Sequence, residues 1–303
     1  MSLTLAITGG TGFVGGHVLR MAARRGHRVQ ALTRRPRTDS EGIRWIEGAL
    51  DRPTSLAALV AGADAVIHIA GVVRAPDAAA FEAGNVAGTA AIVEAAAQAG
   101  VRRFVHVSSL AARLPQLSAY GRSKAAAEAV VTRAPLDWTL VRPPAVFGPG
   151  DTELFELFRM ARRGIVALPP AGRLSVIAVE DLARLLLDLV PAAATIGHLY
   201  EPDDGRAGGW THRAFARAIG AAVGRRVIPI ALPAVMLRGA ALGDRLVRRG
   251  NARLTADRVR YFCHRDWACD PAKAPPLALW RPAGTTAEAL ASTVAWYRAE
   301  GWL

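Results

Sequence analysis

Residues 7–17, ITGGTGFVGGH, place three glycines at three-residue intervals immediately after an apolar run. That run, residues 3–8, predicts a buried strand, and residues 13–25 predict the helix that follows it. Glycine allows the tight turn between the two and lets the backbone approach a ligand closely. The N–H groups at the start of the helix favour a bound anion. A strand, this loop and a helix together predict a dinucleotide pyrophosphate site. Its loop residues are Gly9, Thr11, Gly12, Phe13, Val14 and Gly15.

The first half of the chain alternates short apolar runs with helical patterns. Further strands are expected at residues 27–33, 43–48, 64–71, 102–109 and 137–143, and long helices at residues 78–99 and 118–133. This alternation is typical of a parallel sheet whose two faces are both covered by helices. We therefore predict an α/β fold with a Rossmann-type, doubly wound parallel sheet.

The pattern changes after RPPAVFGPGD, residues 142–151, because helical stretches then predominate. They are expected at residues 152–163, 180–190, 210–222, 231–249, 255–262 and 285–299, with short strands near 165–168 and 196–200. We predict a dinucleotide-binding core of residues 1–150. Residues 151–303 would form a smaller, mainly helical substrate-binding lobe, with some elements returning to the core.

The chain is strongly basic, with a formal net charge of +13 and a sequence pI of about 11.1. Its 38 basic residues are spread through every segment, without a basic tail or a zinc-finger spacing. This distribution argues against nucleic-acid binding as the function. A basic groove for an anionic cofactor or substrate is compatible with the charge.

The two cysteines, Cys263 and Cys269, exclude a disulfide scaffold by their number and offer too few ligands for a metal site. The longest clean apolar run, residues 227–237, is too short to span a bilayer. No signal peptide pattern precedes the first strand, so we expect a cytoplasmic protein.

The end of the second strand indicates which nicotinamide cofactor is used. An acidic side chain there would bind the ribose 2′-hydroxyl of NAD. The chain has Thr33, Arg34 and Arg35 instead, and its next carboxylate is Asp39. Two guanidinium groups suit a 2′-phosphate, so we favour NADP over NAD.

A tyrosine and a lysine four residues apart occur in AYGRSK, as Tyr120 and Lys124. This spacing places both side chains on one face of the expected helix. Ser108 and Ser109 end the fifth expected strand, and ligands bind at the carboxyl ends of strands in open α/β sheets.

The chain resembles the short-chain dehydrogenase/reductase superfamily, in particular its extended and atypical branch, the NAD-dependent epimerase/dehydratase group. The resemblance rests on TGGTGFVG, HVSS, NVAGT (residues 85–89), YGRSK, RPPAVFGPGD and the closing LALWRPAGTTAEALASTVAWYRAEGWL. It covers nearly the whole chain, densely from residue 3 to 150 and sparsely afterwards.

The resemblance implies that Tyr120 is the general acid/base and that Lys124 binds the nicotinamide ribose and favours the tyrosinate. A serine would hydrogen-bond the same substrate oxygen, and we prefer Ser109 to Ser108. It also implies a cofactor path along several strand ends and the loop beside the nicotinamide. Those candidate positions are Leu50, Ala70, Gly71, Asn85, Val107, Pro143, Ala145 and Val146.

Three departures from the family pattern bear on specificity. The chain has GAL, with Ala49, where the family often has Gly-Asp-Leu, so its contact with adenine must differ. Phe147 replaces a common tyrosine, and Ala178 replaces the histidine of a motif that many members carry near the second lobe. We expect the change at Phe147 to be neutral, whereas the one at Ala178 weakens the transfer of any particular substrate.

The leading hypothesis is therefore an NADP-dependent reductase or dehydrogenase acting on a small-molecule carbonyl or alcohol. The alternatives are a sugar-nucleotide epimerase or dehydratase, and a non-catalytic NADP-binding sensor or complex subunit. By resemblance, the helices at residues 78–99 and 118–133 are also candidates for a homodimer interface.

Overall fold

The computed structural model describes residues 2–248 and 255–303, and the chain forms two units. Unit 1 consists of Met1–Pro143, Glu180–Glu201 and Pro275–Trp280. Unit 2 consists of Pro144–Val179, Pro202–Ala274 and Arg281–Leu303. The chain therefore returns to unit 1 twice after first leaving it.

Unit 1 is built on a seven-stranded sheet in which every strand is parallel to its neighbours. The strands are β1 (Thr4–Thr8), β2 (Arg28–Thr33), β3 (Ile43–Glu47), β4 (Ala65–His68), β5 (Arg103–Val107), β6 (Asp137–Val141) and β11 (His198–Tyr200). Their order is β11-β6-β5-β4-β1-β2-β3, so the direction of winding reverses between β1 and β4. Ligands bind at the carboxyl ends of the strands at such a reversal. The predicted fold class is confirmed.

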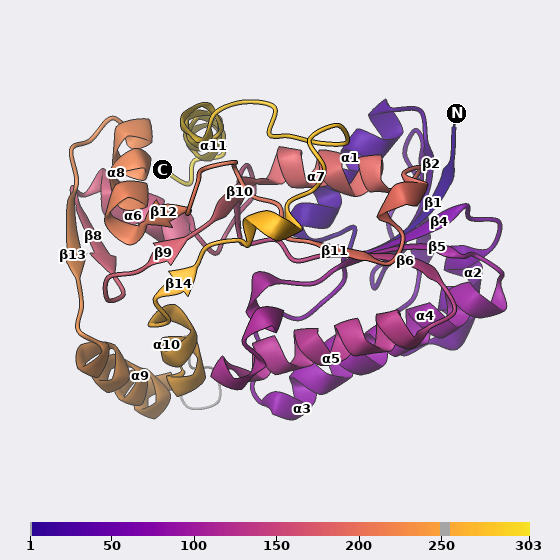
Figure 1. Cartoon of the computed structure of the whole chain (residues 1–303), viewed down its shortest axis with the longest axis horizontal. Helices are drawn as coiled ribbons and strands as arrows, with labels where there is room; N and C mark the ends of the chain where they lie inside the picture. Colours follow the sequence, from indigo (N-terminus) through magenta and orange to yellow (C-terminus); the bar gives the residue numbers. More distant parts are fainter. Residues whose placement is uncertain (1, 249–254) are drawn as a thin grey trace. The chain divides into compact units, whose positions relative to one another are not determined.

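Helices cover both faces of this sheet (Figure 1). They are α1 (Phe13–Arg24), α2 (Pro53–Val60), α3 (Ala78–Phe81), α4 (Gly88–Gln98), α5 (Ala119–Arg133) and α7 (Val179–Leu189). Contacts join α2 to α4 and α4 to α5, which lie along one face, whereas α1 and α7 lie along the other. Leu56, Val66 and Phe104 are buried in the layer between β-strands and α2, α4 and α5. Burial on both faces explains why these strands read as continuous apolar runs.

Two elements of unit 1 differ from the sequence expectation. The helix expected over residues 78–99 is interrupted by a π-helical turn, η1 (Glu82–Ala87), between α3 and α4. Its cause is non-local, because the side chain of Asn85 is buried against the loop after β4. The short helix α2 was not expected, although Pro53 occupies its first turn, where proline is favoured.

Unit 2 combines helices with three short sheets. The helices are α6 (Phe155–Arg162), α8 (His212–Val223), α9 (Ala234–Arg248), α10 (Ala256–Phe262) and α11 (Thr286–Ala299). The sheets pair β7 (Ala145–Phe147) with β10 (Val176–Ala178), β8 (Ile165–Leu168) with β13 (Ile228–Ala231), and β9 (Arg173–Leu174) with β12 (Trp210–Thr211) and β14 (Asp266–Trp267). Phe158, Phe215 and Tyr297 are buried in its core. Most of these strands are too short to produce a readable alternation.

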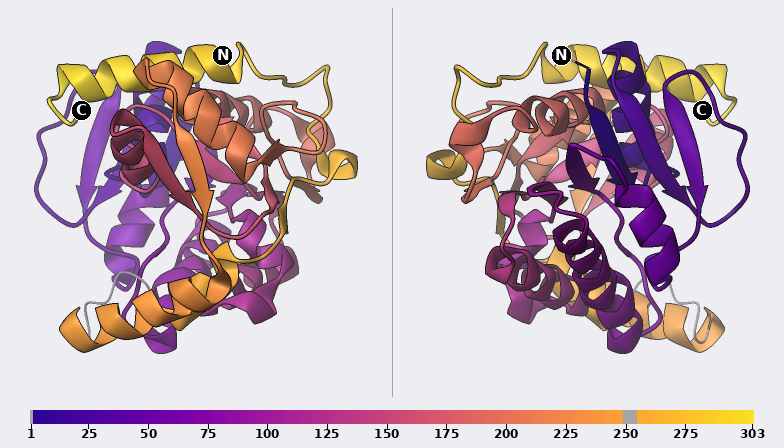
Figure 2. Two further views of the ribbon diagram at one scale, coloured as in Figure 1. Left: turned by 90° about the vertical axis from the view of Figure 1, so that its left-hand side faces the viewer. Right: turned by 90° about the vertical axis from the view of Figure 1, so that its right-hand side faces the viewer.

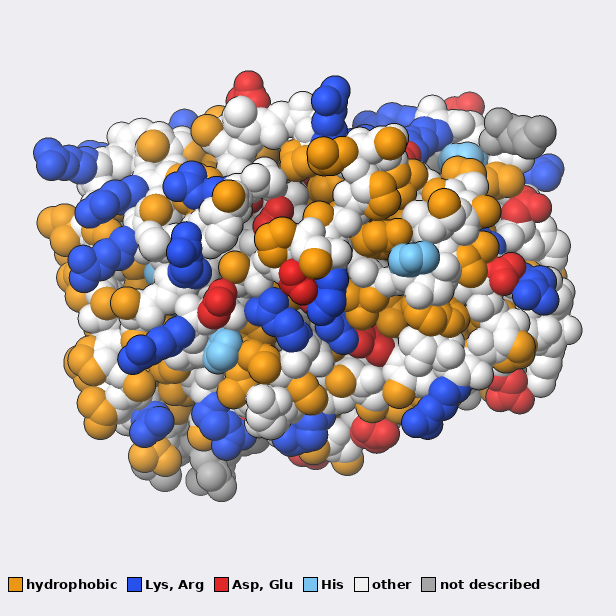
Figure 3. All heavy atoms as spheres, in the orientation of Figure 1, with side chains coloured by type: hydrophobic (Ala, Val, Ile, Leu, Met, Phe, Trp, Pro, Cys, Tyr) orange, Lys and Arg blue, Asp and Glu red, His pale blue; other side chains and the backbone are white. Residues whose placement is uncertain are grey.

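The basic side chains are distributed widely in the structure. On the face drawn in Figure 3, lysine and arginine side chains lie among apolar and neutral ones from one end to the other. Within the described ranges, no helix has the length and apolarity that a membrane-spanning helix needs.

Candidate active site

The glycine loop joins the end of β1 to α1. Gly9 has a φ of +76°, and a Cβ atom there would lie 2.6 Å from the backbone nitrogen of Ala70. A Cβ atom on Gly15 would overlap the carbonyl oxygen of Gly9. The loop is closed by a hydrogen bond from the N–H of Gly12 to the carbonyl of Gly9, at 3.0 Å. Glycine is therefore required at residues 9 and 15 by the close approach of three segments.

The first turn of α1 carries no acidic residue, and its N-cap, Gly12, makes no side-chain cap. The positive end of the helix dipole is thus uncompensated there. Thr11 is exposed, while Phe13 and Val14 are half-buried at the start of α1. The predicted loop residues therefore lie together and form a cradle suited to a phosphate.

The end of β2 offers cations and no carboxylate. Arg34 and Arg35 are both exposed directly after the strand. The hydroxyl of Thr33 donates to the carbonyl of Arg35 at 2.7 Å, which fixes the turn. The first carboxylate, Asp39, accepts the backbone N–H of Trp45 at 2.7 Å and so belongs to the start of β3. After β3, Leu50 lies against α4, where a Cβ atom on Gly88 would be 2.8 Å from its Cδ1.

Lys124 is buried in the second turn of α5, with 4% of its surface exposed. Its ammonium group donates to the carbonyl oxygen of Val107, the last residue of β5, at 2.9 Å. A Cβ atom on Gly71 would lie 3.7 Å from this ammonium and 3.1 Å from Oδ1 of Asn85. Burial lowers the pKa of Lys124 from 10.5 to about 8.

Tyr120 lies in the first turn of α5, which starts after the N-cap Ser118. The Ser118 hydroxyl accepts the N–H of Gly121 at 2.9 Å and so fixes where the helix begins. Tyr120 is half-buried, and its ring centroid lies 6.0 Å from that of Phe81. The structure therefore brings the predicted Tyr120 and Lys124 onto one helix, one turn apart.

The two candidate serines have different surroundings. The Ser108 hydroxyl donates to Oε1 of the buried Glu128 at 2.5 Å. Ser109 is half-buried and caps the short 3₁₀ helix η2 (Leu110–Arg113), where its hydroxyl oxygen accepts the N–H of Ala111 at 3.2 Å. The hydroxyl hydrogen of Ser108 is thus committed to Glu128, whereas the bond made by Ser109 uses its oxygen as the acceptor.

Asn85 joins the loop after β4 to α5. Its Oδ1 accepts the N–H of Val72 at 2.6 Å, and its Nδ2 donates to the Val72 carbonyl at 3.0 Å. The same Nδ2 donates to the hydroxyl of Ser123 at 2.8 Å, and Ser123 donates to the carbonyl of Tyr120. The π-turn that carries Asn85 thereby connects the loop of Ala70 and Gly71 to the helix of Tyr120.

A buried histidine, which the sequence analysis did not single out, links this turn to β1. The Thr89 hydroxyl donates its one hydrogen to the Asn85 carbonyl at 2.6 Å, so it accepts from Nε2 of His68 at 3.0 Å. Nδ1 of His68 is then the acceptor for the Thr8 hydroxyl at 2.6 Å. Thr8 in turn accepts the N–H of Ala70 at 3.2 Å. His68 is therefore a neutral imidazole with its hydrogen on Nε2.

Burial, together with the charge of Lys124, lowers the pKa of His68 from 6.5 to about 3. His106 is its neighbour on β5, with ring centroids 5.2 Å apart, and burial also holds the pKa of His106 well below 6.5. Both histidines interrupt apolar runs at paired positions of adjacent strands. That pairing is the signal by which the sequence could have revealed them.

A second buried polar network follows the ends of β5 and β6. Glu128 accepts two hydrogen bonds from Arg142, at 2.8 and 2.6 Å, besides the one from Ser108. Arg142 also lies 3.6 Å from Glu201, which lies 3.5 Å from Arg113. These charged side chains come from segments far apart in the sequence, so no local sequence motif indicates the network.

Pro143, Ala145 and Val146 lie where the chain passes from unit 1 to unit 2 in the sequence. The carbonyl of Pro143, the last residue of this part of unit 1, accepts the N–H of Leu110 at 3.0 Å. Ala145 and Val146 belong to β7 of unit 2 and pair with Val176 and Ile177 of β10. The unit 1 candidates therefore lie at or just after the ends of the strands from β1 to β6, in the π-turn η1 and on α5. Ala145 and Val146 belong to unit 2.

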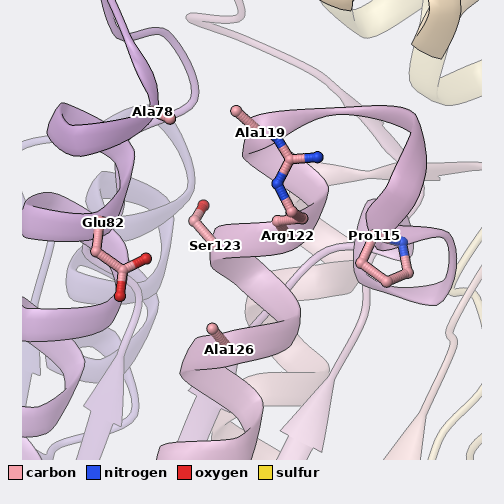
Figure 4. A pocket seen from close by; sticks show the side chains of 7 residues that line it. All are labelled: Ala78, Glu82, Pro115, Ala119, Arg122, Ser123 and Ala126. Atoms are coloured by element: carbon pink, nitrogen blue, oxygen red, sulfur yellow. The ribbon is translucent and has the colours of Figure 1, made fainter.

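A cavity of about 280 Å³ lies on another side of α5 (Figure 4). Its walls are Ala78, Glu82, Pro115, Ala119, Arg122, Ser123 and Ala126. Glu82 and Ser123 reach into the space between their two helices in Figure 4. Tyr120 and Lys124 do not line it, so this cavity is distinct from the candidate catalytic groups.

A sequence model described as NAD(P)H-binding matches residues 9–191, which is more than half of the chain. The chain belongs to this NAD(P)H-binding family. The match begins at Gly9, in the glycine loop, and includes Tyr120 and Lys124. The resemblance to the extended and atypical short-chain dehydrogenases/reductases is confirmed.

Two relatives of this chain are named as reductases. A ceramide reductase of Caulobacter vibrioides is 37% identical over 309 residues, covering 99% of this chain and 96% of the relative. A 2-alkyl-3-oxoalkanoate reductase of Stenotrophomonas maltophilia is 31% identical, covering 65% of this chain and 69% of the relative. This chain is thus similar to a protein named as a reductase over nearly its whole length.

Solved structures of epimerases share the fold. The UDP-N-acetylglucosamine 4-epimerase of Bacillus cereus aligns with a TM-score of 0.73 at 18% identity, covering 98% of this chain and 97% of the epimerase. At this identity the likeness shows the fold alone.

Proposed function

We propose that the chain is an NADPH-dependent reductase that converts a ketone to a secondary alcohol and can catalyse the reverse reaction. One observation carries the proposal: a buried ammonium group, that of Lys124, lies one helical turn from Tyr120. Burial disfavours a charged group, and buried charges of this kind are common at functional sites. An ammonium in this position would stabilise a tyrosinate at Tyr120.

The cofactor cradle fits a dinucleotide. Cβ atoms on Gly9 and Gly15 would fill the space between β1, α1 and the loop after β4, and neither is present. Arg34 and Arg35 support NADPH, because two exposed guanidinium groups follow β2 and no carboxylate precedes Asp39. When bound, the nicotinamide supplies the hydride that reaches the carbonyl carbon.

Side chains of this protein would transfer the proton. Tyr120 donates its phenolic proton to the carbonyl oxygen, so that the ketone gains one hydride and one proton. The positive charge of Lys124 stabilises the tyrosinate that remains. Free tyrosine titrates near pH 10, and each unit of lowering requires about 1.4 kcal/mol of preferential stabilisation of the anion. A buried ammonium within the same helix face is the group in this site that supplies such stabilisation.

Ser109 is proposed as the hydroxyl that hydrogen-bonds the substrate oxygen. Its oxygen accepts from Ala111, which leaves its hydroxyl hydrogen for a substrate. Ser108 is proposed as a structural residue, because Glu128 accepts its hydrogen within the network to Arg142.

For the substrate we propose a ketone of the ceramide class of lipids, since the relative of that name matches the chain over 99% of its length. The test is turnover of such a ketone dispersed in detergent, followed by NADPH oxidation and by mass spectrometry of the alcohol. We expect stoichiometric loss of NADPH and formation of alcohol. NADPH binding without turnover of this ketone or a panel of simpler ketones would favour the non-catalytic alternative.

The cofactor preference is tested by titrating NADPH and NADH against the wild type, Arg34→Asp and Arg28→Asp. Arg28 is exposed at the opposite end of β2 and serves as the matched control. We expect Arg34→Asp to weaken NADPH binding by about tenfold or more, in line with the loss of a charge-assisted phosphate contact, and Arg28→Asp to leave it unchanged. Equal affinities for both cofactors in the wild type would refute the preference.

The epimerase or dehydratase alternative rests on shared fold, since those structures are less than 25% identical to this chain. It predicts interconversion of a UDP-sugar with bound NAD and no net cofactor turnover. We expect no reaction of this chain with UDP-sugars.

A further inference from the structure

Helix α9 of unit 2 exposes one long apolar side. Val235, Met236 and Leu242 are 70%, 57% and 63% exposed, which is unusual for large apolar side chains on a helix. Phe262, at the end of α10, is 38% exposed, and α10 packs on α9. Figure 2 shows α9 continuing from β13 along one edge of unit 2.

The exposed residues form a continuous stripe along the helix. Val235 and Leu242 are seven residues apart and therefore share a face, and Met236 lies next to them. Gly239 and Gly243 fall within the same stripe, and a Cβ atom on either would meet no atom within 4 Å. On the opposite side, Ala241 is buried. No part of the described chain covers the apolar stripe.

Positive charge accompanies this stripe. Arg238 borders it, is exposed, and lies close enough to the Cys263 thiol of α10 to lower the pKa of that group, against the larger effect of burial, which raises it. The segment from residue 234 to 262 has seven arginines and two aspartates, a net charge of +5.

Of the described arginines in this segment, Arg238 is the one that the structure places beside the stripe, since Arg258 and Arg260 pair with Glu153 and Asp257. An apolar helix face bordered by arginine, within a basic segment, is the pattern of helices that lie in the interface of an anionic membrane.

We propose that α9, with Phe262 of α10, docks this protein on the surface of a bilayer that contains anionic lipids. The apolar stripe of Val235, Met236 and Leu242 would enter the boundary between headgroups and acyl chains, and Arg238 would contact the lipid phosphates. This surface association needs no spanning helix.

The charge of the segment favours a bilayer over a second copy of the chain as the partner of α9. Pairing α9 with another α9 would bring two segments of net charge +5 together within a pair of chains that each carry +13. Repulsion opposes that contact, whereas anionic headgroups attract the same arginines. The inference does not rest on the proposed reaction, because lipid binding is measured without turnover.

The test is flotation of the full chain with vesicles of phosphatidylcholine alone and of phosphatidylcholine mixed equally with phosphatidylglycerol. We expect binding to the mixed vesicles to be at least about tenfold tighter than to phosphatidylcholine. The triple variant Val235→Gln, Met236→Gln, Leu242→Gln removes the apolar stripe while keeping residues that favour a helix. It should lower binding to mixed vesicles by about tenfold or more.

Leu277→Gln is the matched control, since Leu277 is an 82% exposed leucine in unit 1 and should leave binding unchanged. Arg238→Glu should weaken binding to the mixed vesicles and have little effect with phosphatidylcholine. Circular dichroism of each variant confirms that it is folded. Equal binding of wild type and triple variant would overturn the proposal. So would a concentration-dependent dimer that the triple variant abolishes while vesicle binding is absent in the wild type.

Discussion

Lysine occurs twice in this chain, against 36 arginines. Lys273 lies near the surface, 3.7 Å from Asp270. Lys124 is buried, and its ammonium lies against the carbonyl of Val107 and beside Gly71. A compact ammonium fits this space, whereas the planar fork of arginine is wider and directs its hydrogens differently. The choice of lysine at residue 124 thus follows from its surroundings.

We therefore predict that Lys124→Arg lowers kcat by about a hundredfold or more although the charge is conserved, because the group no longer fits beside Tyr120. Steady-state kinetics with NADPH and a ketone measure the effect. Lys273→Arg, the same change at the surface, should keep wild-type activity. Near-normal turnover of Lys124→Arg would show that any cation serves there.

Replacement of the two candidate serines should have different effects in the same kinetic assay. Ser109→Ala should lower kcat by about tenfold to a hundredfold, as expected for the loss of one hydrogen bond to the reacting oxygen. Ser108→Ala should mainly lower stability, since it removes a donor from the buried Glu128. The assay is paired with urea unfolding of both variants. The reverse result, a stable but inactive Ser108→Ala, would exchange the two roles.

The sequence predicted those site residues whose relation is local. Tyr120 and Lys124 are linked by helical spacing, and the glycines of residues 9–15 by their place between a strand and a helix. It did not predict that Ser108 is held by Glu128 or that His68 joins β1 to α4. Those partners come from separate elements, so only the packed fold brings them together.

At the scale of elements, the π-turn between α3 and α4 replaces a helix that the sequence predicts as continuous. Alanine-rich residues 78–99 have no local signal for the interruption. The turn depends on Asn85, which satisfies the half-buried N–H and carbonyl of Val72 and reaches Ser123 of α5. π-turns often mark functional sites, and here one connects the loop after β4 to α5.

Asn85→Ala would remove the hydrogen-bond partner of these half-buried backbone groups of Val72. We predict a loss of about 2 kcal/mol in the free energy of unfolding, together with a lower kcat, because the loop of Gly71 is no longer tied to α5. Urea unfolding and steady-state kinetics measure the two effects. Gln98→Ala, at an exposed residue of α4, is the control. Unchanged stability of Asn85→Ala would contradict the bracing role.

The neutral His68 predicts a pH dependence of stability. Its pKa is about 3 in the folded protein and near 6.5 in a model peptide, so the unfolded chain binds the extra proton between these values. The contribution of His68 is fully present above pH 6.5 and is lost as the pH falls toward 3. The slope is about 1.4 kcal/mol per pH unit inside that window.

Urea unfolding of the wild type and His68→Gln at several pH values from neutral to acid measures this slope. We expect His68→Gln to have a shallower dependence, while His198→Gln, at an exposed histidine of β11, keeps that of the wild type. Parallel curves for the wild type and His68→Gln would show that His68 is not held neutral by the fold.

At the scale of the whole molecule, the strand and helix alternation of the first half was sufficient to predict the parallel sheet and its class. Glu180–Glu201 belongs to unit 1, where it adds β11 beside β6. Of the short strands of unit 2, the sequence predicted β8, near residues 165–168. It did not predict β7, β9, β10, β12 and β14, because each has only two or three residues, which pair through long-range contacts. The functional division at residue 150 stays a prediction.

The homodimer suggested for the helices at residues 78–99 and 118–133 also stays a prediction. The cavity beside Arg122 lies between these two segments, and Ala119 and Ala126 line it. Small side chains there allow the close approach of another helix. Sedimentation analysis of the purified chain measures its oligomeric state.

The central claim is that Tyr120 transfers a proton in an NADPH-dependent reduction. Its most direct test is single-turnover reduction of a ketone by wild type and Tyr120→Phe, with NADPH binding measured in parallel. Tyr261→Phe, at a tyrosine of α10 in unit 2, is the matched control. We predict that Tyr120→Phe binds NADPH with wild-type affinity and reduces the ketone about a thousandfold more slowly, while Tyr261→Phe is unaffected. A Tyr120→Phe variant that turns over at the wild-type rate would contradict the account.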